Sequence, residues 1–477
     1  MTSLFTTSHV ISKSGVQFGT SGARGLVEHF TPCVCEAFAY AFIEGIKSKF
    51  FFDTVAVAID NRPSSPAMAQ AVINAIKSMG YNAVYYGVLP TPALAYTAMQ
   101  DKMPSIMITG SHIPFDRNGI KFYRPDGEIT KVDEQAILHT EVQFLPAITA
   151  PDITVNSKAA SQYVERYTKL FDQELLVGRR IGIYEHSSAG RDLYQGLFEA
   201  LGAEVVSLER TNEFVPIDTE AVAESDKAKA RLWSKQHRLD FIFSTDGDGD
   251  RPLVADENGE WLRGDILGLL CSKALQIDAL AVPISCNTII SKSSGFNVVS
   301  LTKIGSPYVI AEFEKLTKQS KAVAGFEANG GYLLGSDIEV NNCLLKALPT
   351  RDAVLPALML LLLARKKNTS INELVSALPK RFNYSDRIQN FAPEKSQAIL
   401  TQGKEAPQQL LKLLGLENVS VSNVDLTDGL RLTLSDLTIL HLRPSGNAPE
   451  LRCYAEASDF RIAKKLVDNS LFTISRI

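Results

Sequence analysis

The chain has 477 residues, of which 45% are hydrophobic and 21% charged, and its formal net charge is -4 at pH 7. This is the composition of an ordinary globular protein of roughly three or four domains, and the negative balance excludes a general attraction for nucleic acid, so any phosphate must be held locally. Because the six cysteines form no Cys-x-x-Cys pair and no basic-then-apolar signal segment opens the sequence, we expect reduced thiols in a cytoplasmic protein with no membrane partner.

Strand-like and helix-like segments alternate along most of the chain. The ranges 54–60 and 83–86 are predicted strands, and the ranges 66–80 and 92–100 are predicted helices. Because the same alternation returns between residues 180 and 327, we expect three related α/β units with mixed sheets.

The last section of the chain differs in kind. From about residue 380, short alternating strands precede a predicted helix at 459–470, which favours a smaller α+β domain. The apolar run 354–364 is shorter than the ~20 residues of a membrane span and predicts a buried helix. We expect a linker at 145–154, a hinge near residue 380, and four domains at 1–153, 154–263, 264–380 and 381–477.

Ser111 follows a strand-like stretch that begins at Ile106, and it stands in a loop beside His112 and Lys121. A hydroxyl presented in this way can carry a phosphoryl group. A serine after a glycine also commonly makes an ordinary turn. Further loops suited to phosphate or metal elsewhere in the chain favour the phosphoryl carrier.

The sharpest chemical signal is Asp-Gly-Asp-Gly-Asp-Arg at 246–251. Its three carboxylates at alternate positions, separated by glycines, can converge on one hard divalent cation, which predicts magnesium held by Asp246, Asp248 and Asp250. Two alternatives are an acidic solvated turn and an EF-hand loop that ends at Glu257. Arg251 at the place where an EF-hand requires glycine, and a strand-like run before the motif, disfavour the EF-hand.

Three further loops carry polar groups suited to a sugar phosphate. The glycine-rich segment 18–25 surrounds Arg24, the segment 325–332 offers Glu327 and Asn329 to sugar hydroxyls, and the segment 443–452 is suited to gripping a phosphate. Each segment also has a purely structural interpretation. In order, these are a glycine-rich turn, a buried glutamate at a strand end, and a surface β-turn with incidental arginines.

Taken together, these motifs resemble the α-D-phosphohexomutase superfamily, which includes the phosphomannomutases, phosphoglucomutases and phosphoglucosamine mutases, from about Phe18 to Glu456. The motifs are Thr-Gly-Ser-His-Ile-Pro at 109–114, Asp-Gly-Asp-Gly-Asp-Arg at 246–251, and the shorter matches at 60–66, 89–93 and 118–121. The resemblance implies three related α/β domains and a smaller C-terminal domain around a central cleft.

The resemblance also implies roles for individual residues. Ser111 would be the phosphoserine and a magnesium ligand with the three aspartates, and His112, Lys121 and Arg24 would act in catalysis. Substrate would be bound by Arg251, Glu327, Asn329, Arg443, Ser445, Gly446, Asn447 and Arg452.

Three departures from the family pattern are visible in the sequence. Ile113 stands where asparagine is usual, and the C-terminal loop reads Gly-Asn-Ala where Asn-Thr or Gly-Thr is common. The sugar loop reads Glu-Ala-Asn-Gly-Gly where many relatives show Glu-x-Ser-Gly-His, so a histidine with a proposed acid/base role is missing. Lys121 and Arg24 remain as candidates to assist proton transfer.

The activity that the resemblance implies is reversible phosphoryl transfer between the 6- and 1-hydroxyls of a hexose phosphate, through a 1,6-bisphosphate. Mannose phosphates are the first expectation, and the product would feed nucleotide-sugar supply. Glucose or glucosamine phosphate is the second, and a non-catalytic sugar-phosphate sensor is a distant third. We expect a monomer or homodimer.

Overall fold

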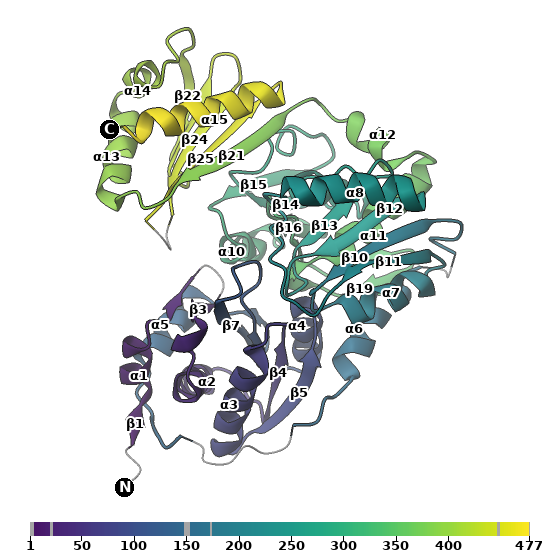
Figure 1. Cartoon of the computed structure of the whole chain (residues 1–477), viewed down its shortest axis with the longest axis vertical. Helices are drawn as coiled ribbons and strands as arrows, with labels where there is room; N and C mark the ends of the chain where they lie inside the picture. The colour runs from purple at the N-terminus through teal and green to yellow at the C-terminus, as the bar shows by residue number, and fades with distance from the viewer. Residues whose placement is uncertain (1–3, 20–21, 147–152, 172–173, 446–448, 477) are drawn as a thin grey trace.

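The computed structural model describes the chain except residues 1–3, 20–21, 147–152, 172–173, 446–448 and 477. Four large sheets follow one another along the sequence, each with its own helices (Figure 1). The predicted architecture of three α/β units and a C-terminal α+β unit is confirmed. Among the described residues, no helix is long and apolar enough to cross a membrane.

The first unit is a mixed sheet in the order β2-β3-β7-β6-β4-β5. Its strands are β2 (Gln17–Phe18), β3 (Ala23–Leu26), β4 (Thr54–Ile59), β5 (Asn82–Val88), β6 (Ser105–Ile108) and β7 (Arg117–Arg124). Its helices are α1 (Thr7–Lys13), α2 (Pro32–Ile46), α3 (Ser65–Ser78), α4 (Thr91–Gln100) and α5 (Lys131–His139). β8 (Gly127–Glu128) pairs with β7, and β1 (Phe5–Thr6) pairs with β9 (Gln143–Phe144).

The apolar run of β4 shows why this sheet is covered on both faces. Val55 and Val57 pack in one core with α2 and α3, whereas Ala56 and Ala58 pack in another core with α4. Successive side chains of a strand point to opposite faces, so a continuous apolar run forms a strand buried on both sides.

The second and third units repeat this plan. The second has strands β10 (Arg180–His186), β11 (Glu204–Arg210), β12 (Phe241–Thr245) and β13 (Pro252–Ala255), and helices α6 (Lys158–Thr168), α7 (Arg191–Ala200) and α8 (Glu224–His237). The third has strands β14 (Ala279–Pro283), β15 (Val298–Thr302), β16 (Val323–Phe326), β17 (Tyr332–Leu334) and β20 (Leu348–Asp352), with a side hairpin of β18 (Ile338–Val340) and β19 (Cys343–Leu345). Its helices are α9 (Gly264–Ala274), α10 (Ser306–Leu316), α11 (Val354–Lys367) and α12 (Ile371–Ser376).

All three units share one strand order. The three runs are β5-β4-β6-β7, β11-β10-β12-β13 and β15-β14-β16-β17. In each run, the strand that comes first in the chain lies between the second and the third and is parallel to both, and the fourth strand is antiparallel to the third. The turn between the third and fourth strands therefore occupies the same place in each unit. The predicted relation between the units is thus visible in their topology.

The fourth unit is an antiparallel sheet in the order β21-β25-β24-β23-β22. Its elements are β21 (Phe382–Ile388), α13 (Pro393–Glu405), α14 (Pro407–Leu413), β22 (Val421–Asp425), β23 (Leu430–Leu434), β24 (Ile439–Pro444), β25 (Leu451–Ala457) and α15 (Phe460–Ile474). The predicted buried helix at 354–364 is confirmed as part of α11, which packs against α9 inside the large core shared by the first three units.

Three site residues expected in loops lie on strands instead. Arg24 is on β3, Lys121 is on β7, and Arg452 is on β25, paired across the ladder with Arg443 on β24. Their loops are shorter than predicted because antiparallel partners continue the strands close to each turn.

Candidate active site

The three equivalent turns of the α/β units hold the predicted chemical groups. Ser111 lies between β6 and β7, the acidic loop 246–251 between β12 and β13, and Glu327 between β16 and β17. They meet in space: Ser111 Oγ donates to Asp246 Oδ2 at 2.6 Å, and Arg351 links the acidic loop to Glu327. One repeated position in the fold therefore supplies three parts of one site.

Ser111 is buried and has a strained backbone. Its φ of 53° lies in the left-handed region, which costs a non-glycine residue about 1–3 kcal/mol and is typical of functional sites. Its N–H donates to Thr109 Oγ1 at 2.8 Å, and Thr109 in turn donates to Asp60 at 2.8 Å. The surrounding structure thus holds Ser111 in a conformation that directs its hydroxyl at Asp246.

Arg62 is the clamp that holds this loop. Its guanidinium is fully buried, and it donates to Asp60 Oδ2 and to the carbonyl oxygens of Ser111, Ile113, Pro114 and Arg117 at 2.6–3.2 Å. A neutral side chain could not satisfy so many acceptors from one point. The clamp fixes the path of the chain on both sides of His112.

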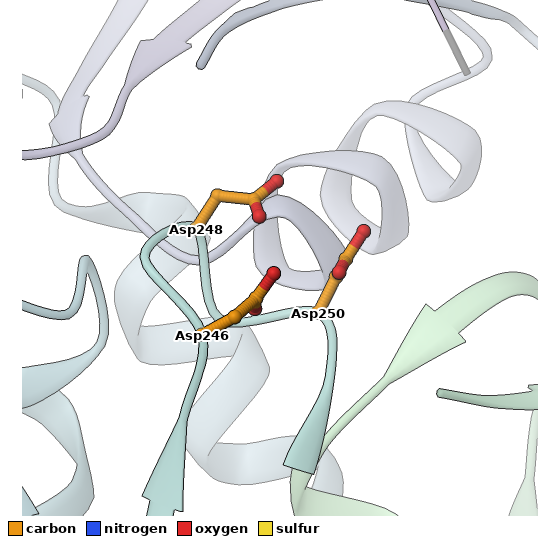
Figure 2. A group of neighbouring side chains, drawn as sticks. All are labelled: Asp246, Asp248 and Asp250. Atoms are coloured by element: carbon orange, nitrogen blue, oxygen red, sulfur yellow. The ribbon is translucent and has the colours of Figure 1, made fainter. Parts of the chain in front are cut away.

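The acidic loop fits a hard divalent cation. Asp246, Asp248 and Asp250 are all buried, and each offers an oxygen within 4.8 Å of the others. Figure 2 shows the three carboxylates turned towards one region above the loop. Among the described residues, Asp248 Oδ1 and Asp250 Oδ1 have no hydrogen-bond partner. Buried carboxylate oxygens without hydrogen-bond partners are costly, and a metal ion bound among them would offset that cost.

The EF-hand alternative is wrong. The motif follows the strand β12 rather than a helix, and Glu257 is outside the group of converging carboxylates. The carboxylate of Glu257 instead accepts from the Asn372 N–H at 3.4 Å. The alternative of an acidic solvated turn is wrong as well, because none of the three aspartates is exposed to solvent.

The pKa values of Asp246 and Asp250 are shifted in opposite directions. Burial, together with Asp248 and Asp250, raises the pKa of Asp246 well above its ordinary value. Burial also opposes ionisation of Asp250, but Arg351 and Lys121 outweigh it and the pKa of Asp250 lies below its ordinary value. Lys121 Nζ donates to Asp248 at 2.5 Å and to Asp250 at 2.8 Å. A cation bound between the aspartates would favour full ionisation of all three.

His112 is neutral in this setting. The adjacent Arg251, then burial and Arg24, lower the pKa of His112 to about 2. Its Nδ1 accepts from Arg251 Nη1 at 2.9 Å and lies 3.3 Å from Ser111 Oγ. Because a guanidinium only donates, Nδ1 is an acceptor and the ring proton is on Nε2. Burial, Arg251 and Arg351 lower the pKa of Arg24 to about 10, because burial and the two neighbouring positive charges oppose its ionised form.

Glu327 and Asn329 form a tight turn directly after β16. Both are buried, and Glu327 Oε2 accepts from Arg351 Nη1 at 3.1 Å. Asn329 Oδ1 accepts from the Gly331 N–H at 3.0 Å, and its carbonyl oxygen accepts from Thr219 of the second unit at 2.9 Å. The expected sugar-binding asparagine therefore also shapes its own loop.

The fourth unit contributes two arginines on neighbouring strands. Arg443 Nε donates to Asp428 at 2.7 Å, and the same carboxylate accepts the Ile304 N–H of the third unit at 2.9 Å. The Ser445 N–H donates to the Glu450 carbonyl at 2.8 Å. Gly446 and Asn447 lie outside the described residues, so their predicted roles have no structural counterpart here.

Four successive segments, which make up most of the chain, match one family of known proteins. Residues 15–143, 161–259, 263–382 and 396–470 match, in order, the three α/β/α domains and the C-terminal domain described as phosphoglucomutase/phosphomannomutase. The chain is a member of the phosphoglucomutase/phosphomannomutase family. Within it, the chain is 57% identical over 474 residues to a phosphomannomutase from Salmonella muenchen, covering 99% of this chain and 98% of the relative.

Two further relatives are less similar to this chain. The chain is 41% identical to a phosphomannomutase from Sinorhizobium fredii, over 97% of this chain and 99% of the relative. It is 28% identical to a phosphoglucosamine mutase from Clostridium beijerinckii, over 76% of this chain and 82% of the relative. A solved family protein from Burkholderia thailandensis has the same fold, with a TM-score of 0.75, 20% identity and 98% coverage of both chains.

Three residues of this site were missed by sequence reasoning alone. Arg62 and Thr91 lie in the segments 60–66 and 89–93, whose likeness to the family was noted without roles for single residues. Thr91 donates to Asp248 Oδ2 at 2.6 Å. Arg351 gave no signal in the sequence, because it belongs to a strand far from every loop motif. Only its partners in the structure identify it.

Proposed function

We propose that this family member is a phosphomannomutase that interconverts mannose 6-phosphate and mannose 1-phosphate. The observation that carries the proposal is the direct hydrogen bond from Ser111 Oγ to the acidic loop of the next unit. The names of the two relatives with 57% and 41% identity support mannose phosphates as substrates. We also propose a cytoplasmic enzyme, a monomer or homodimer, that acts on small hexose phosphates.

Ser111 is the proposed phosphoryl carrier. In the first step, the bond between phosphorus and Ser111 Oγ breaks while a bond forms to the free sugar hydroxyl, which loses its proton. The sugar is then a 1,6-bisphosphate. It turns over in the site and returns its other phosphoryl group to Ser111. Arg251 donates to His112, the neighbour of Ser111, and Arg24 acts electrostatically on the same ring. Both arginines are proposed to offset charge as it shifts between the oxygens.

Magnesium is the proposed metal, held by Asp246, Asp248, Asp250 and the oxygen of Ser111. When bound, it would neutralise charge on the transferring phosphoryl group. Lys121 also neutralises two of these aspartates and reaches the same place from β7. Lys121 and Arg24 are the candidates for assisting proton transfer, and the Nδ1 of neutral His112 accepts a hydrogen bond from Arg251 beside the serine.

The sugar ring and the non-reacting phosphate of the substrate are assigned to different units. Glu327 and Asn329 are proposed to bind ring hydroxyls, because they lie at the turn equivalent to that of Ser111. The non-reacting phosphate is assigned to the fourth unit, through Arg443, Ser445, Gly446, Asn447 and Arg452. A fixed phosphate grip with hydroxyl contacts common to both poses would let one site accept either orientation of the sugar.

The nucleophile is tested by Ser111→Ala, with the exposed Ser376→Ala as the matched control. We expect Ser111→Ala to abolish mutase turnover while substrate binding by calorimetry stays close to that of the native protein. Intact mass should show one phosphate on the native protein and on Ser376→Ala, removed by substrate, and none at position 111 in Ser111→Ala. Undiminished turnover by Ser111→Ala would exclude this residue as the carrier.

Substrate class is tested by turnover of mannose, glucose and glucosamine 1-phosphates side by side. We expect mannose 1-phosphate to give the highest kcat/KM. A higher value for glucose or glucosamine 1-phosphate would select one of the alternative mutases. A protein that binds these sugars, yet carries no phosphate and turns over none of them, would be the non-catalytic sensor.

A further inference from the structure

Gly331 leaves room for another residue's side chain. A Cβ atom at this position would lie 2.5 Å from Arg351 Cδ and 2.6 Å from Arg351 Cγ. The neighbouring Gly330 has a φ of 89°, which favours glycine on conformational grounds, whereas Gly331 is not in the left-handed region. Glycine is needed at 331 for space, and the stem of Arg351 fills that space.

The guanidinium of Arg351 joins two units of the fold. Nε and Nη2 lie 3.0 Å from Asp250 Oδ2 in the second unit. Nη1 donates to Glu327 Oε2 and to Ser306 Oγ in the third unit, both at 3.1 Å. The side chain is only 3% exposed, so water does not screen these contacts strongly. The acidic loop and the sugar loop are therefore tied through one residue.

An arginine suits this position better than a lysine. Its planar guanidinium presents donors in fixed directions and can hold two carboxylates at a set distance and angle, whereas an ammonium is a point charge on a flexible stem. Without the arginine, Asp250 and Glu327 would be buried carboxylates with less opposing charge, and each would turn towards other donors or water.

We propose that Arg351 is a positioning residue that fixes Glu327 relative to Asp250, and that Gly331 is glycine so that Arg351 can lie there. This inference rests on the proposed function, since Glu327 is expected to contact the hexose. Holding Glu327 in place sets the distance between the sugar hydroxyl and Ser111. The phosphate grip of the fourth unit lies elsewhere and is left unchanged by Arg351.

The test compares Arg351→Gln, Arg351→Lys, Gly331→Ala and the double variant Arg351→Gln with Gly331→Ala. Gly331→Ala displaces the arginine without removing any charge. Its matched control is Gly196→Ala on α7, where an added Cβ meets nothing within 4 Å. For each protein, kcat and KM for mannose 1-phosphate are measured, together with the thermal unfolding midpoint as a check on folding.

We expect Arg351→Gln and Gly331→Ala each to lower kcat by about 100-fold, the cost of a misplacement of about 1 Å, with a smaller change in KM. Arg351→Lys should recover less than about tenfold of that loss. The double variant should be no slower than Arg351→Gln alone, because both changes act on the same contact. A general structural defect would instead lower the unfolding midpoint, without a change in kcat larger than that in KM. It would also not leave the double variant as fast as Arg351→Gln alone.

Two results would overturn the inference by itself: an active native protein whose Arg351→Gln variant keeps kcat within about twofold, or losses that multiply in the double variant. If Arg351→Gln does not fold, Gly331→Ala against Gly196→Ala decides the question alone. A native protein with no mutase activity towards any hexose phosphate would instead overturn the proposed function, and this inference with it.

Discussion

Replacing Arg62 by methionine should loosen the loop that carries Ser111. The guanidinium makes five side-chain hydrogen bonds, four of them to carbonyl oxygens of residues 111–117 and one to Asp60. It also lies 3.9 Å from the centroid of the Phe214 ring in the second unit. Methionine keeps much of the stem volume but removes every donor. Four carbonyl oxygens therefore lose this donor, and Asp60 loses its cationic partner while Thr109 and Ser65 still donate to it.

The expected cost follows from these contacts. Removing one partner of a buried ion pair costs about 3–5 kcal/mol, because the remaining charge stays buried without its counter-charge. Here that charge is the carboxylate of Asp60, which is buried. If this cost falls on local opening of the loop, amide hydrogen exchange should accelerate by roughly 100- to 4,000-fold, at about 1.4 kcal/mol for each factor of ten. The amides to follow are those of Ser111, Ile113 and Arg117, which are hydrogen-bonded within the loop.

Hydrogen exchange measured by mass spectrometry on peptides covering residues 109–117 reports this change directly. The matched control is Arg117→Met, an exposed arginine at the start of β7 whose backbone carbonyl, not its side chain, accepts from Arg62. We expect native exchange in Arg117→Met, and fast exchange with a large loss of turnover in Arg62→Met. Exchange in Arg62→Met within about threefold of the native rate would refute the clamp, since it would correspond to less than about 1 kcal/mol.

Three further predictions concern neighbouring contacts. Gly247→Ala would bring a Cβ to 2.7 Å from the Ser111 carbonyl oxygen, so we expect kcat to fall at least about tenfold, and native kcat would show that the two loops need not touch. Asp428→Asn removes the charged partner of Arg443 and should raise KM about tenfold with kcat nearly constant, as a lost charge-assisted hydrogen bond requires; a change confined to kcat would contradict a binding role. For His112, Arg251 and burial keep the pKa in the folded protein at about 2. Below the unfolded-state pKa of about 6.5, only the unfolded chain takes up this proton, so the free energy of unfolding falls by about 1.4 kcal/mol per pH unit. His112→Gln should lack this loss in denaturant titrations between about pH 6.5 and 4, and parallel pH dependences of the two proteins would count against the lowered pKa.

The local character of the elements was predictable where the pattern was strong. The apolar run at 54–60 became β4, and the run at 354–364 became part of α11. The helix α2 was not anticipated, because most of its residues from Val34 to Ile43 are buried and it lacks the alternation of polar and apolar faces that marks a surface helix. Strand ends were misjudged at Lys121 and Arg452, where pairing with a distant strand, not local sequence, extends the element.

The sequence by itself determined which chemical groups are present. Ser111 before a histidine, three aspartates separated by glycines, and Glu327 in a glycine-bounded turn are local patterns, and their chemistry depends on residue types at short spacing. Only the tertiary structure decided that these turns meet, because the contact between Ser111 and Asp246 joins residues 135 positions apart. Arg62 and Arg351 show the same difference between sequence and structure. A buried arginine acquires its role from the carbonyls and carboxylates that folding brings around it, and the residues next to it in the sequence do not predict these partners.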